Sequence, residues 1–267
     1  MAVVLLVFDH QRRRRVALKV LRPAAVAAME SARFLREIRI LADLRHRNIL
    51  RLLDSGTADG LLYYTTPHVD GISLRERLDR DGAMTVPEAQ RIAREVAAAL
   101  ASAHDRGIVH RDVKPENLLL EGRHVWVADF GIARAMSAAG ADRLTRTGMV
   151  LGTPSYVSPE QVIAGRAVDG RTDQYSLACT LFEMLAGRPP FDGRTADVLV
   201  RQHLTETPPN LEAMRADVPW EVSDAVARGM AKAPADRFAD MREFARALGT
   251  PRGPWLRAAW PWGAVAR

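Results

Sequence analysis

The sequence predicts an α+β fold, in which a small antiparallel sheet with one helix is followed by a larger, mainly helical part. Two apolar, β-branched runs, "AVVLLVF" and "RRVALKVL", stand near the N-terminus and are typical of paired strands. From Ser73 onward the hydrophobic period is helical almost throughout. The chain has 267 residues, of which 48% are hydrophobic and 26% charged, so it can bury a large core and disorder is excluded for most of it.

The two apolar runs are separated by the polar turn Asp9 to Arg14 and predict an antiparallel pair. The segment "AAMESARFLREIRILADL" predicts a helix, because Phe34, Ile38, Leu41 and Leu44 fall at helical spacing. Two further apolar runs, "ILRLLDSG" and "LLYYTT", flank a turn at Thr57 to Gly60. Residues 1–66 therefore predict a small sheet that carries one helix.

The mainly helical part begins with "TVPEAQRIAREVAAALASAHDRG", which has Thr85 as its expected N-cap, a proline in the first turn and a stop at Gly107. We expect later helices at about 172–187, 195–206, 219–232 and 238–248. Residues 133–157 are small and polar without a clear period, which is typical of a functional loop. The final stretch, rich in Pro, Gly, Trp and Arg, is interpreted as a tail or linker, with a juxtamembrane anchor as the alternative.

Charge and cysteine content restrict the cellular setting. Lys and Arg number 38 against 32 Asp and Glu, and this excess is spread along the chain, which favours a solvated surface over nucleic-acid binding. The single cysteine, Cys179, lies in an apolar run and excludes a disulfide framework. No stretch predicts a transmembrane segment or a signal peptide. We expect a cytoplasmic protein, associated with a membrane if a further segment follows residue 267.

One loop carries the residues that phosphoryl transfer requires. In "GIVHRDVKPENLLL", Asp112 offers a carboxylate that can orient a hydroxyl nucleophile. Lys114 offers a charge to neutralise the migrating phosphate, and Asn117 offers an amide oxygen that can bind magnesium. The spacing places the three groups in one reaction centre.

Four motifs occur together in one order: "VALK", "HRDVKPEN", "DFG" and "GTPSYVSPE". With them the chain resembles the catalytic domain of bacterial eukaryotic-like (Hanks-type) serine/threonine protein kinases, from Val3 to about Leu248. The resemblance implies a two-lobed fold: N-lobe and hinge at 1–69, C-lobe at 70–249 with an activation segment at 129–160, and a tail or linker at 250–267. It implies ATP and Mg²⁺, with Mn²⁺ as a substitute, and protein substrates with Ser or Thr.

The resemblance also implies roles for single residues. Asp112 would be the catalytic base, Lys114 would stabilise the γ-phosphate, and Asn117 and Asp129 would bind metal. Lys19 would bind the ATP phosphates and pair with Glu37 from the first helix. The adenine pocket would use the gatekeeper Thr66, the hinge residues Pro67 and Val69, and the ring contacts Val4, Ala17 and Leu119.

In the activation segment, Thr145 and Thr147 resemble a pair that is autophosphorylated in trans, which implies transient homodimers. Arg111 would hold the phosphorylated loop, and Thr153 would position the incoming hydroxyl. Three residues are expected to be architectural: Glu160 paired with Arg237, and Asp173 as the anchor of the catalytic loop. Phe130 is expected to pack against His110 and Leu41.

The chain departs from the pattern at its start, because no G-x-G-x-x-G-x-V loop precedes "VALK". Val4 falls where the family places the valine of this loop, so we expect the first strand and both leading glycines to be missing. Two alternatives to an active protein kinase follow: a truncated kinase or pseudokinase scaffold with weak nucleotide binding, and a small-molecule phosphotransferase of the aminoglycoside or choline type. A nucleic-acid binder has no motif beyond the net charge.

Overall fold

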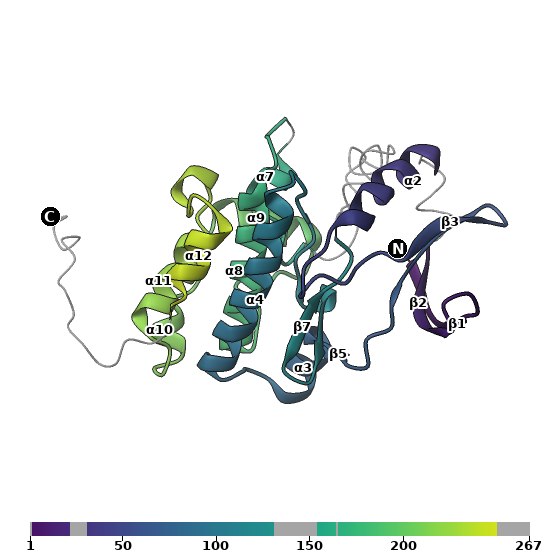
Figure 1. Ribbon diagram of the computed structural model, residues 1–267. Helices are drawn as coiled ribbons and strands as arrows, with labels where there is room; N and C mark the ends of the chain where they lie inside the picture. The colour runs from purple at the N-terminus through teal and green to yellow at the C-terminus, as the bar shows by residue number, and fades with distance from the viewer. Residues whose placement is uncertain (1, 22–30, 131–153, 164, 250–267) are drawn as a thin grey trace, which may run out of the picture.

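The computed structural model describes residues 2–21, 31–130, 154–163 and 165–249. It has two parts, which we call the sheet lobe (residues 2–67) and the helical lobe (residues 74–249) (Figure 1). The predicted α+β class, with an antiparallel sheet followed by a mainly helical part, is confirmed. Much of the predicted loop at 133–157 and the predicted tail at 250–267 lie outside the described residues.

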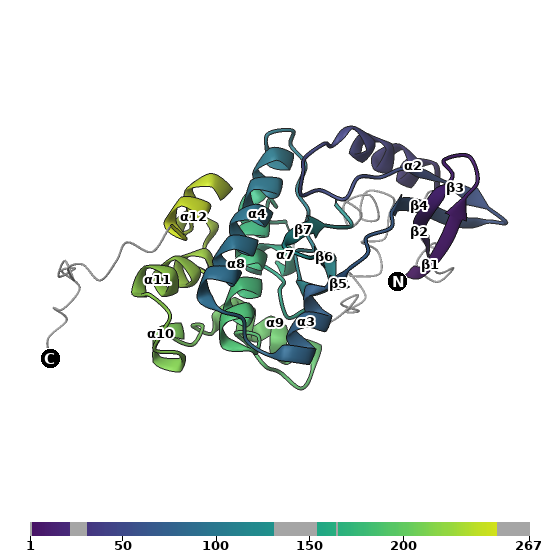
Figure 2. The same ribbon diagram turned by 60° about the horizontal axis from the view of Figure 1, so that its bottom comes forward.

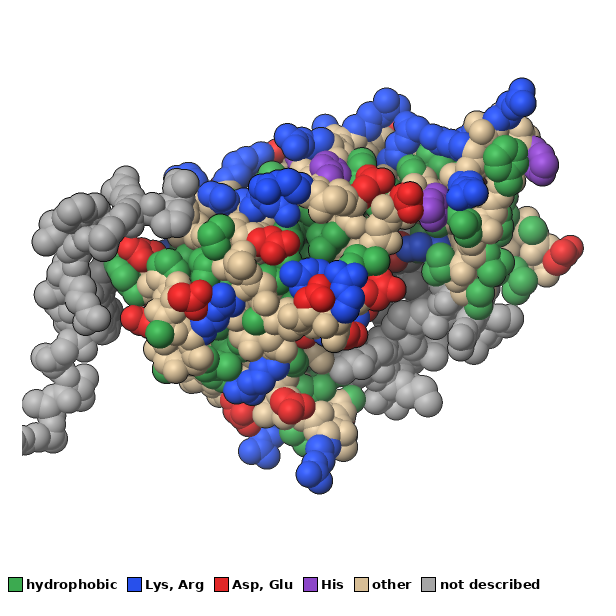
Figure 3. All heavy atoms as spheres, turned by 90° about the horizontal axis from the view of Figure 1, so that it is seen from below, with side chains coloured by type: hydrophobic (Ala, Val, Ile, Leu, Met, Phe, Trp, Pro, Cys, Tyr) green, Lys and Arg blue, Asp and Glu red, His purple; other side chains and the backbone are tan. Residues whose placement is uncertain are grey.

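The sheet lobe contains four antiparallel strands in the order β1-β2-β4-β3. Their bounds are β1 Ala2–Asp9, β2 Arg14–Leu21, β3 Asp54–Ala58 and β4 Leu61–Pro67. The predicted pairing of the first two runs is confirmed, with Val4 opposite Lys19. Strand β1 lies at the outer edge of this sheet, and Val4, Leu6 and Phe8 are exposed although they are apolar. Figure 3 shows hydrophobic side chains on the surface of this lobe.

The helix of the sheet lobe is α2, Ser31–Ile40, followed by the 3-10 turn η1, Leu41–Asp43. Phe34, Ile38, Leu41 and Leu44 are all buried, as their spacing predicts. The α-helix ends before Leu41, so the last two positions of the predicted stripe reach the core from a 3-10 turn and from the segment that follows it.

The run "ILRLLDSG" differs from the prediction, because strand β3 begins only at Asp54. Residues 49–53 instead bridge the two lobes through single backbone contacts. The N–H of Leu50 donates to the carbonyl of Val127 at 2.9 Å, and the N–H of Leu53 donates to the carbonyl of Thr65 at 2.8 Å. This segment is therefore fixed to both lobes without belonging to a strand.

A second antiparallel sheet, with the strand order β5-β6-β7, lies at the junction of the lobes. Its strands are β5 Ile72–Ser73, β6 Leu118–Glu121 and β7 His124–Val127, and the 3-10 turn η2, Pro115–Asn117, leads into β6. Helix α3, Leu74–Asp81, starts directly after β5 with a capping box between Ser73 and Glu76. Because Leu118 at the start of β6 lies opposite Val127 at the end of β7, the loops that contain Asp112 and Asp129 lie at the same end of this small sheet.

The helical lobe is built around α8, Gly170–Ala186, whose side chains from Thr172 to Leu185 are all buried. Such all-round burial arises because other helices cover α8; in Figures 1 and 2 the long helix α4, Val86–His104, runs beside it. The remaining helices are α7 Pro159–Val162, α9 Ala196–Thr205, α10 Leu211–Met214, α11 Trp220–Gly229, the 3-10 turn η4 Pro234–Asp236 and α12 Met241–Ala247. Helices α11 and α12 are shorter than predicted. No helix within the described ranges combines the length and the apolarity that a bilayer crossing requires.

Candidate active site

The loop that carries Asp112 follows α4 and is anchored from below by Asp173 of α8. The Asp173 carboxylate, which is fully buried, accepts the backbone N–H of His110 at 2.8 Å and that of Arg111 at 2.7 Å. His104, at the end of α4, places its Nε2 2.7 Å from the same carboxylate. The prediction that Asp173 anchors this loop is confirmed, because one buried carboxylate accepts two backbone N–H groups of the loop and is itself held by His104.

The structure brings Asp112, Lys114 and Asn117 together as the spacing predicts. The ammonium of Lys114 lies 2.8 Å from the Asp112 carboxylate. Asn117 donates its amide N–H groups to the Asp112 carboxylate at 2.9 Å and to the Asp112 backbone carbonyl at 2.7 Å. Because the Asp112 side chain remains 42% exposed, a substrate hydroxyl can reach it.

The loop after β7 is clamped to the Asp112 loop. The N–H of Ala128 donates to the carbonyl of Asn117, and Nε2 of His110 lies near the carbonyl of Ala128, both at 2.9 Å. The Phe130 ring meets the His110 ring edge-on, with centroids 4.6 Å apart, so the predicted packing of these two rings is confirmed. Leu41 lines the same small cavity, of about 20 Å³, as Phe130.

Two residues of these loops have left-handed backbone conformations. Arg111, directly before Asp112, has φ 68°, and Asp129, directly before Phe130, has φ 58°. In each case the neighbouring contacts hold the conformation: Asp173 and Gln161 bind the backbone of Arg111, and Lys19 binds the side chain of Asp129.

The sheet lobe contributes Lys19 and Tyr64 to Asp129. Lys19 forms an ion pair with the Asp129 carboxylate, and the Tyr64 hydroxyl donates to the same carboxylate at 3.0 Å. Burial, together with the charge of Asp129, raises the pKa of Tyr64 well above its usual value, so Tyr64 stays a hydrogen-bond donor. Tyr64 lies opposite Lys19 in the β2–β4 register, on the face that it shares with Thr66. The sequence prediction missed Tyr64, although alternation along "LLYYTT" places it on this face.

The predicted ion pair of Lys19 with Glu37 is untested, because the side chain of Glu37 lies outside the described residues. The same holds for Thr145, Thr147 and Thr153. Arg111 is described: its Nε is buried, and within the described part of the chain it has no hydrogen-bond partner.

The predicted adenine contacts come from both lobes. Ala17 lies opposite Thr66, and Val4 lies opposite Lys19, so these side chains share one face of the sheet. Thr66 is buried, whereas Val4 is 59% exposed. Pro67 ends β4 opposite Val16, Val69 is half-buried in the linker after it, and Leu119 stands in β6 of the junction sheet. Their joint role in binding a nucleotide stays a prediction.

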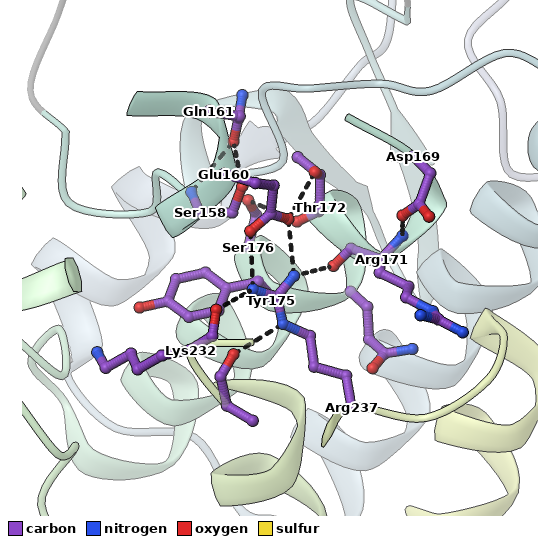
Figure 4. Close-up of polar contacts among 12 residues, drawn as sticks. Ser158, Glu160, Gln161, Asp169, Arg171, Thr172, Tyr175, Ser176, Lys232 and Arg237 are labelled. Atoms are coloured by element: carbon purple, nitrogen blue, oxygen red, sulfur yellow. Dashed lines mark hydrogen bonds and ion pairs between the residues drawn. The ribbon is translucent and has the colours of Figure 1, made fainter. Parts of the chain in front are cut away.

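Glu160 and Arg237 form the predicted architectural pair (Figure 4). Two parallel contacts of 2.7 and 2.8 Å join the guanidinium to the carboxylate, and both side chains are buried. Thr172 donates to Glu160 at 2.7 Å, and Arg237 also donates to the backbone carbonyls of Ala231 and Arg171. Burial alone would raise the pKa of Glu160, but the bonds and charge of Arg237 hold it below its usual value. The pair ties helix α7 to the region before α12.

The donor set at this site suits a hard divalent cation. Asp129 offers a carboxylate and Asn117 an amide oxygen, and the contact between Ala128 and Asn117 keeps their loops adjacent. Oxygen ligands of this kind are those that Mg²⁺ prefers. No cluster of three or more His, Cys, Asp or Glu side chains with metal-binding geometry occurs among the described residues, so an all-carboxylate metal site is not formed there.

Comparison with known proteins finds matches that cover most of the chain. A family model described as "Protein kinase domain" matches residues 1–244. The chain is 40% identical over 251 residues to serine/threonine-protein kinase PknB of Mycolicibacterium smegmatis, covering 91% of this chain and 40% of that protein. It is 41% identical over 246 residues to PknF of Mycobacterium tuberculosis, covering 88% of this chain and 50% of that protein. The chain thus spans half or less of the length of these relatives.

The fold is shared with a solved structure. A crystal structure of Rad53, residues 1–466, in complex with AMP-PNP superimposes with a TM-score of 0.75 at 24% sequence identity, covering 92% of this chain and 61% of that one. This likeness shows a two-lobed kinase fold.

Proposed function

Because this chain belongs to the protein kinase family, we propose that it transfers the γ-phosphoryl group of ATP to serine or threonine hydroxyls of proteins. The family generally uses ATP and a divalent metal. The observation that carries the proposal is the joined set of Asp112, Lys114 and Asn117, held rigidly by Asp173 and facing Asp129 and Lys19 across the junction of the lobes.

In this reaction the substrate oxygen bonds to the γ-phosphorus while the bond between that phosphorus and the β,γ-bridging oxygen breaks, and the electron pair of that bond leaves with ADP. Asp112 orients the hydroxyl and takes its proton. Lys114 lies 2.8 Å from the Asp112 carboxylate and so places a positive charge beside the attacking oxygen. There it neutralises negative charge on the oxygens of the migrating phosphoryl group.

Lys19 and Asp129 are proposed to act by exchanging partners. In the structure their opposite charges neutralise each other in a partly buried position. When the nucleotide binds, Lys19 meets phosphate oxygens and Asp129 is released to bind metal, so neither charge is left buried without a partner. Tyr64 keeps one Asp129 oxygen fixed by its hydrogen bond during this exchange.

Asp129 and Asn117 would hold Mg²⁺, or Mn²⁺ in its place, and the ion supplies neutralisation of phosphate charge when bound. The adenine ring is proposed to lie between the sheet lobe and β6. There it would contact Val4 and Ala17 above and Leu119 below, beside Thr66 and the hinge residues Pro67 and Val69. Proline at the first hinge position suits this role, since only its carbonyl is used there.

Activation is proposed to require phosphorylation of Thr145 and Thr147 in trans, within a transient homodimer. The buried Nε of Arg111, which has no partner in the described part of the chain, supports this proposal, because a phosphate would satisfy it. Thr153 is proposed to position the incoming hydroxyl. We place the protein in the cytoplasm, where a buried free thiol such as Cys179 stays reduced.

The test is transfer of labelled phosphate from ATP to a generic basic protein, in Mg²⁺ and in Mn²⁺. The Asp112→Asn variant should lower the rate about a hundredfold or more, because it removes the base. Asp224→Asn, an exposed isosteric change on α11, is the matched control and should keep the wild-type rate. Mass spectrometry of the active wild type should find Thr145 and Thr147 phosphorylated.

Different failures have different meanings. If the wild type labels nothing with either metal, the scaffold alternative replaces the kinase proposal. If Asp112→Asn labels as fast as the wild type, the assignment of the base is wrong. If choline or an aminoglycoside is labelled and protein is not, the chain is a small-molecule phosphotransferase.

A further inference from the structure

A second hollow lies at the linker between the lobes, and none of its lining residues belongs to the loop that carries Asp112. Its volume is about 490 Å³, and it is lined by residues of the segment 44–51, by the hinge residues 67–69, and by Glu121 and Trp126 of the junction sheet. We call it the rear groove. Its floor is apolar, formed by side chains such as Leu44, Ile49 and Trp126, while arginines stand at its rim.

The rear groove is rigid, because backbone contacts fix its main wall. The N–H of Val127 donates to the carbonyl of Asn48 at 2.7 Å, and the N–H of Leu50 donates back to Val127 at 2.9 Å. The buried Asn48 side chain donates to the carbonyl of Val125 at 2.9 Å and to Glu95 at 3.1 Å. His124 lies 2.9 Å from the carbonyl of Arg47. A ligand would therefore meet a preformed surface and would need little reordering of the protein.

The rim carries excess positive charge. Arg45, Arg47 and Arg51 are exposed, and in the described ranges their guanidinium groups form no ion pair. The one acidic side chain of the lining, Glu121, already accepts the indole N–H of Trp126 at 3.1 Å. Figure 3 shows Lys and Arg side chains gathered along the upper edge of the molecule in that view. An anionic partner would thus find three arginines free to bind its carboxylates.

We propose that the rear groove binds an acidic peptide segment of a partner protein, with an apolar side chain of that segment seated on the floor. An apolar floor inside a charged rim matches a short segment whose large apolar residues are flanked on both sides by acidic residues. A membrane surface would not enter a concave site, and single-stranded nucleic acid would require several exposed aromatic rings for stacking. This assignment concerns recognition of a partner and is independent of phosphoryl transfer.

Binding can be measured by fluorescence anisotropy with the full chain and a fluorescein-labelled peptide, Glu-Glu-Asp-Leu-Phe-Asp-Glu-Glu. The double variant Arg45→Glu/Arg51→Glu should weaken binding about tenfold or more, because two attractive pairs become repulsive. The control Arg201→Glu/Arg246→Glu makes the same change in net charge at exposed positions of α9 and α12 and should bind as the wild type does. Circular dichroism melts verify that all variants are folded.

Two altered peptides separate the contributions of charge and apolar contact. A peptide with Gln and Asn in place of its acids should lose the salt dependence and most of the affinity, and a peptide with Ser in place of Leu-Phe should bind several-fold more weakly.

Equal weakening by both double variants would mean that binding depends only on net charge, and this would overturn the proposal. It would also be overturned if the peptide fails to bind the wild type, or if anionic vesicles or an oligothymidylate bind in a manner sensitive to Arg45 and Arg51 while the peptide does not. The neutral variant Arg45→Gln/Arg51→Gln should show an intermediate loss of affinity. It keeps the proposal testable if the Arg45→Glu/Arg51→Glu variant does not fold.

Discussion

The two lobes hold their functional side chains in different ways. In the helical lobe, Asp112 stands on a loop whose backbone is bound by the buried carboxylate of Asp173, and Asn117 closes over it with two hydrogen bonds. In the sheet lobe, Lys19 and Tyr64 are placed by strand register, and the polar contact that both make is with Asp129 across the junction. The first arrangement is fixed before any ligand binds, whereas the second depends on how the lobes meet.

The difference shows which lobe supplies rigidity and which supplies adjustment. Buried polar pairs fix the position of the chain because leaving either partner alone is costly. A β-ladder fixes the order of side chains along a face, yet it allows the whole sheet to shift relative to its neighbour. Positioning for chemistry therefore belongs to the helical lobe, and adaptation to the nucleotide belongs to the sheet lobe.

The strongest test of this view removes a buried pair from the helical lobe. Arg237→Ala leaves the Glu160 carboxylate buried without its partner, and we expect a loss of about 3–5 kcal/mol in the free energy of unfolding. Urea denaturation followed by circular dichroism measures this. Arg242→Ala, which removes an exposed ion pair with Asp105, is the control and should leave the transition unchanged. A small effect of Arg237→Ala would contradict the assigned rigidity of the helical lobe.

A second test uses pH. Burial, followed by the charge of Lys232, lowers the pKa of His203 to about 4, so the folded protein binds fewer protons there than the unfolded chain does between pH 4 and pH 6.5. The contribution of His203 to the free energy of unfolding is therefore fully present above pH 6.5. It falls by about 3 kcal/mol as the pH decreases from 6.5 toward 4. His203→Gln should flatten the dependence of the free energy of unfolding on pH in this range. His10→Gln, in the turn after β1, is the control, and an unchanged slope in His203→Gln would refute the prediction.

A third test weakens the anchor of the catalytic loop. Asp173→Asn replaces one acceptor oxygen by a donor that faces backbone N–H groups, and a loss of about 1.5–3 kcal/mol in loop positioning is expected. Steady-state kinetics should show a turnover number lowered about ten- to a hundredfold, with little change in the KM for ATP. A rise in that KM alone would mean that Asp173 acts on the sheet lobe, contrary to the comparison.

The smallest expected effect concerns Tyr64. Tyr64→Phe removes one hydrogen bond to Asp129 at nearly unchanged volume, which is worth about 0.5–1.5 kcal/mol. Calorimetric titration should show nucleotide affinity lowered about two- to tenfold, while the turnover number at saturating ATP stays the same. Tyr63→Phe, on the opposite face of β4, is the matched control. A loss of turnover without a loss of affinity would place Tyr64 with the rigid residues.

Much of the helical lobe could be predicted from the sequence, because its anchors lie within motifs. The motifs predict contacts for three features, and the structure contains each of them: the anchor Asp173, the ring of Phe130, and the pair of Glu160 with Arg237. The start of α12 was predicted three residues early, although Asp240 followed by Glu243 is a capping signal that marks it.

The contacts between the lobes could not be predicted in the same way. Tyr64 meets Asp129 only through the register of strands and the way the two lobes meet. Within the helical lobe, the contact of His104 with Asp173 likewise depends on the approach of two helices that are distant in sequence. The run from Ile49 to Leu53 looked like a strand because it is apolar, but its backbone groups are divided between β4 and β7. The rear groove is lined in part by this same segment and in part by residues distant from it in sequence, so no local sequence pattern predicts it.

The left-handed backbone at Arg111 and Asp129 sets a limit on engineering. Glycine adopts this conformation without steric strain, whereas an arginine there costs about 1–2 kcal/mol and an aspartate, which enters this region more readily, costs less. A screen that selects only for heat resistance would therefore favour glycine at Arg111, whose Nε has no hydrogen-bond partner in the described part of the chain. A glycine at position 111 would relieve strain but remove the guanidinium beside the reaction centre, whereas a glycine at position 129 would also leave Lys19 and Tyr64 without their carboxylate partner. Improved variants of this chain should be selected with both positions held fixed, so that gains in heat resistance come from elsewhere in the fold.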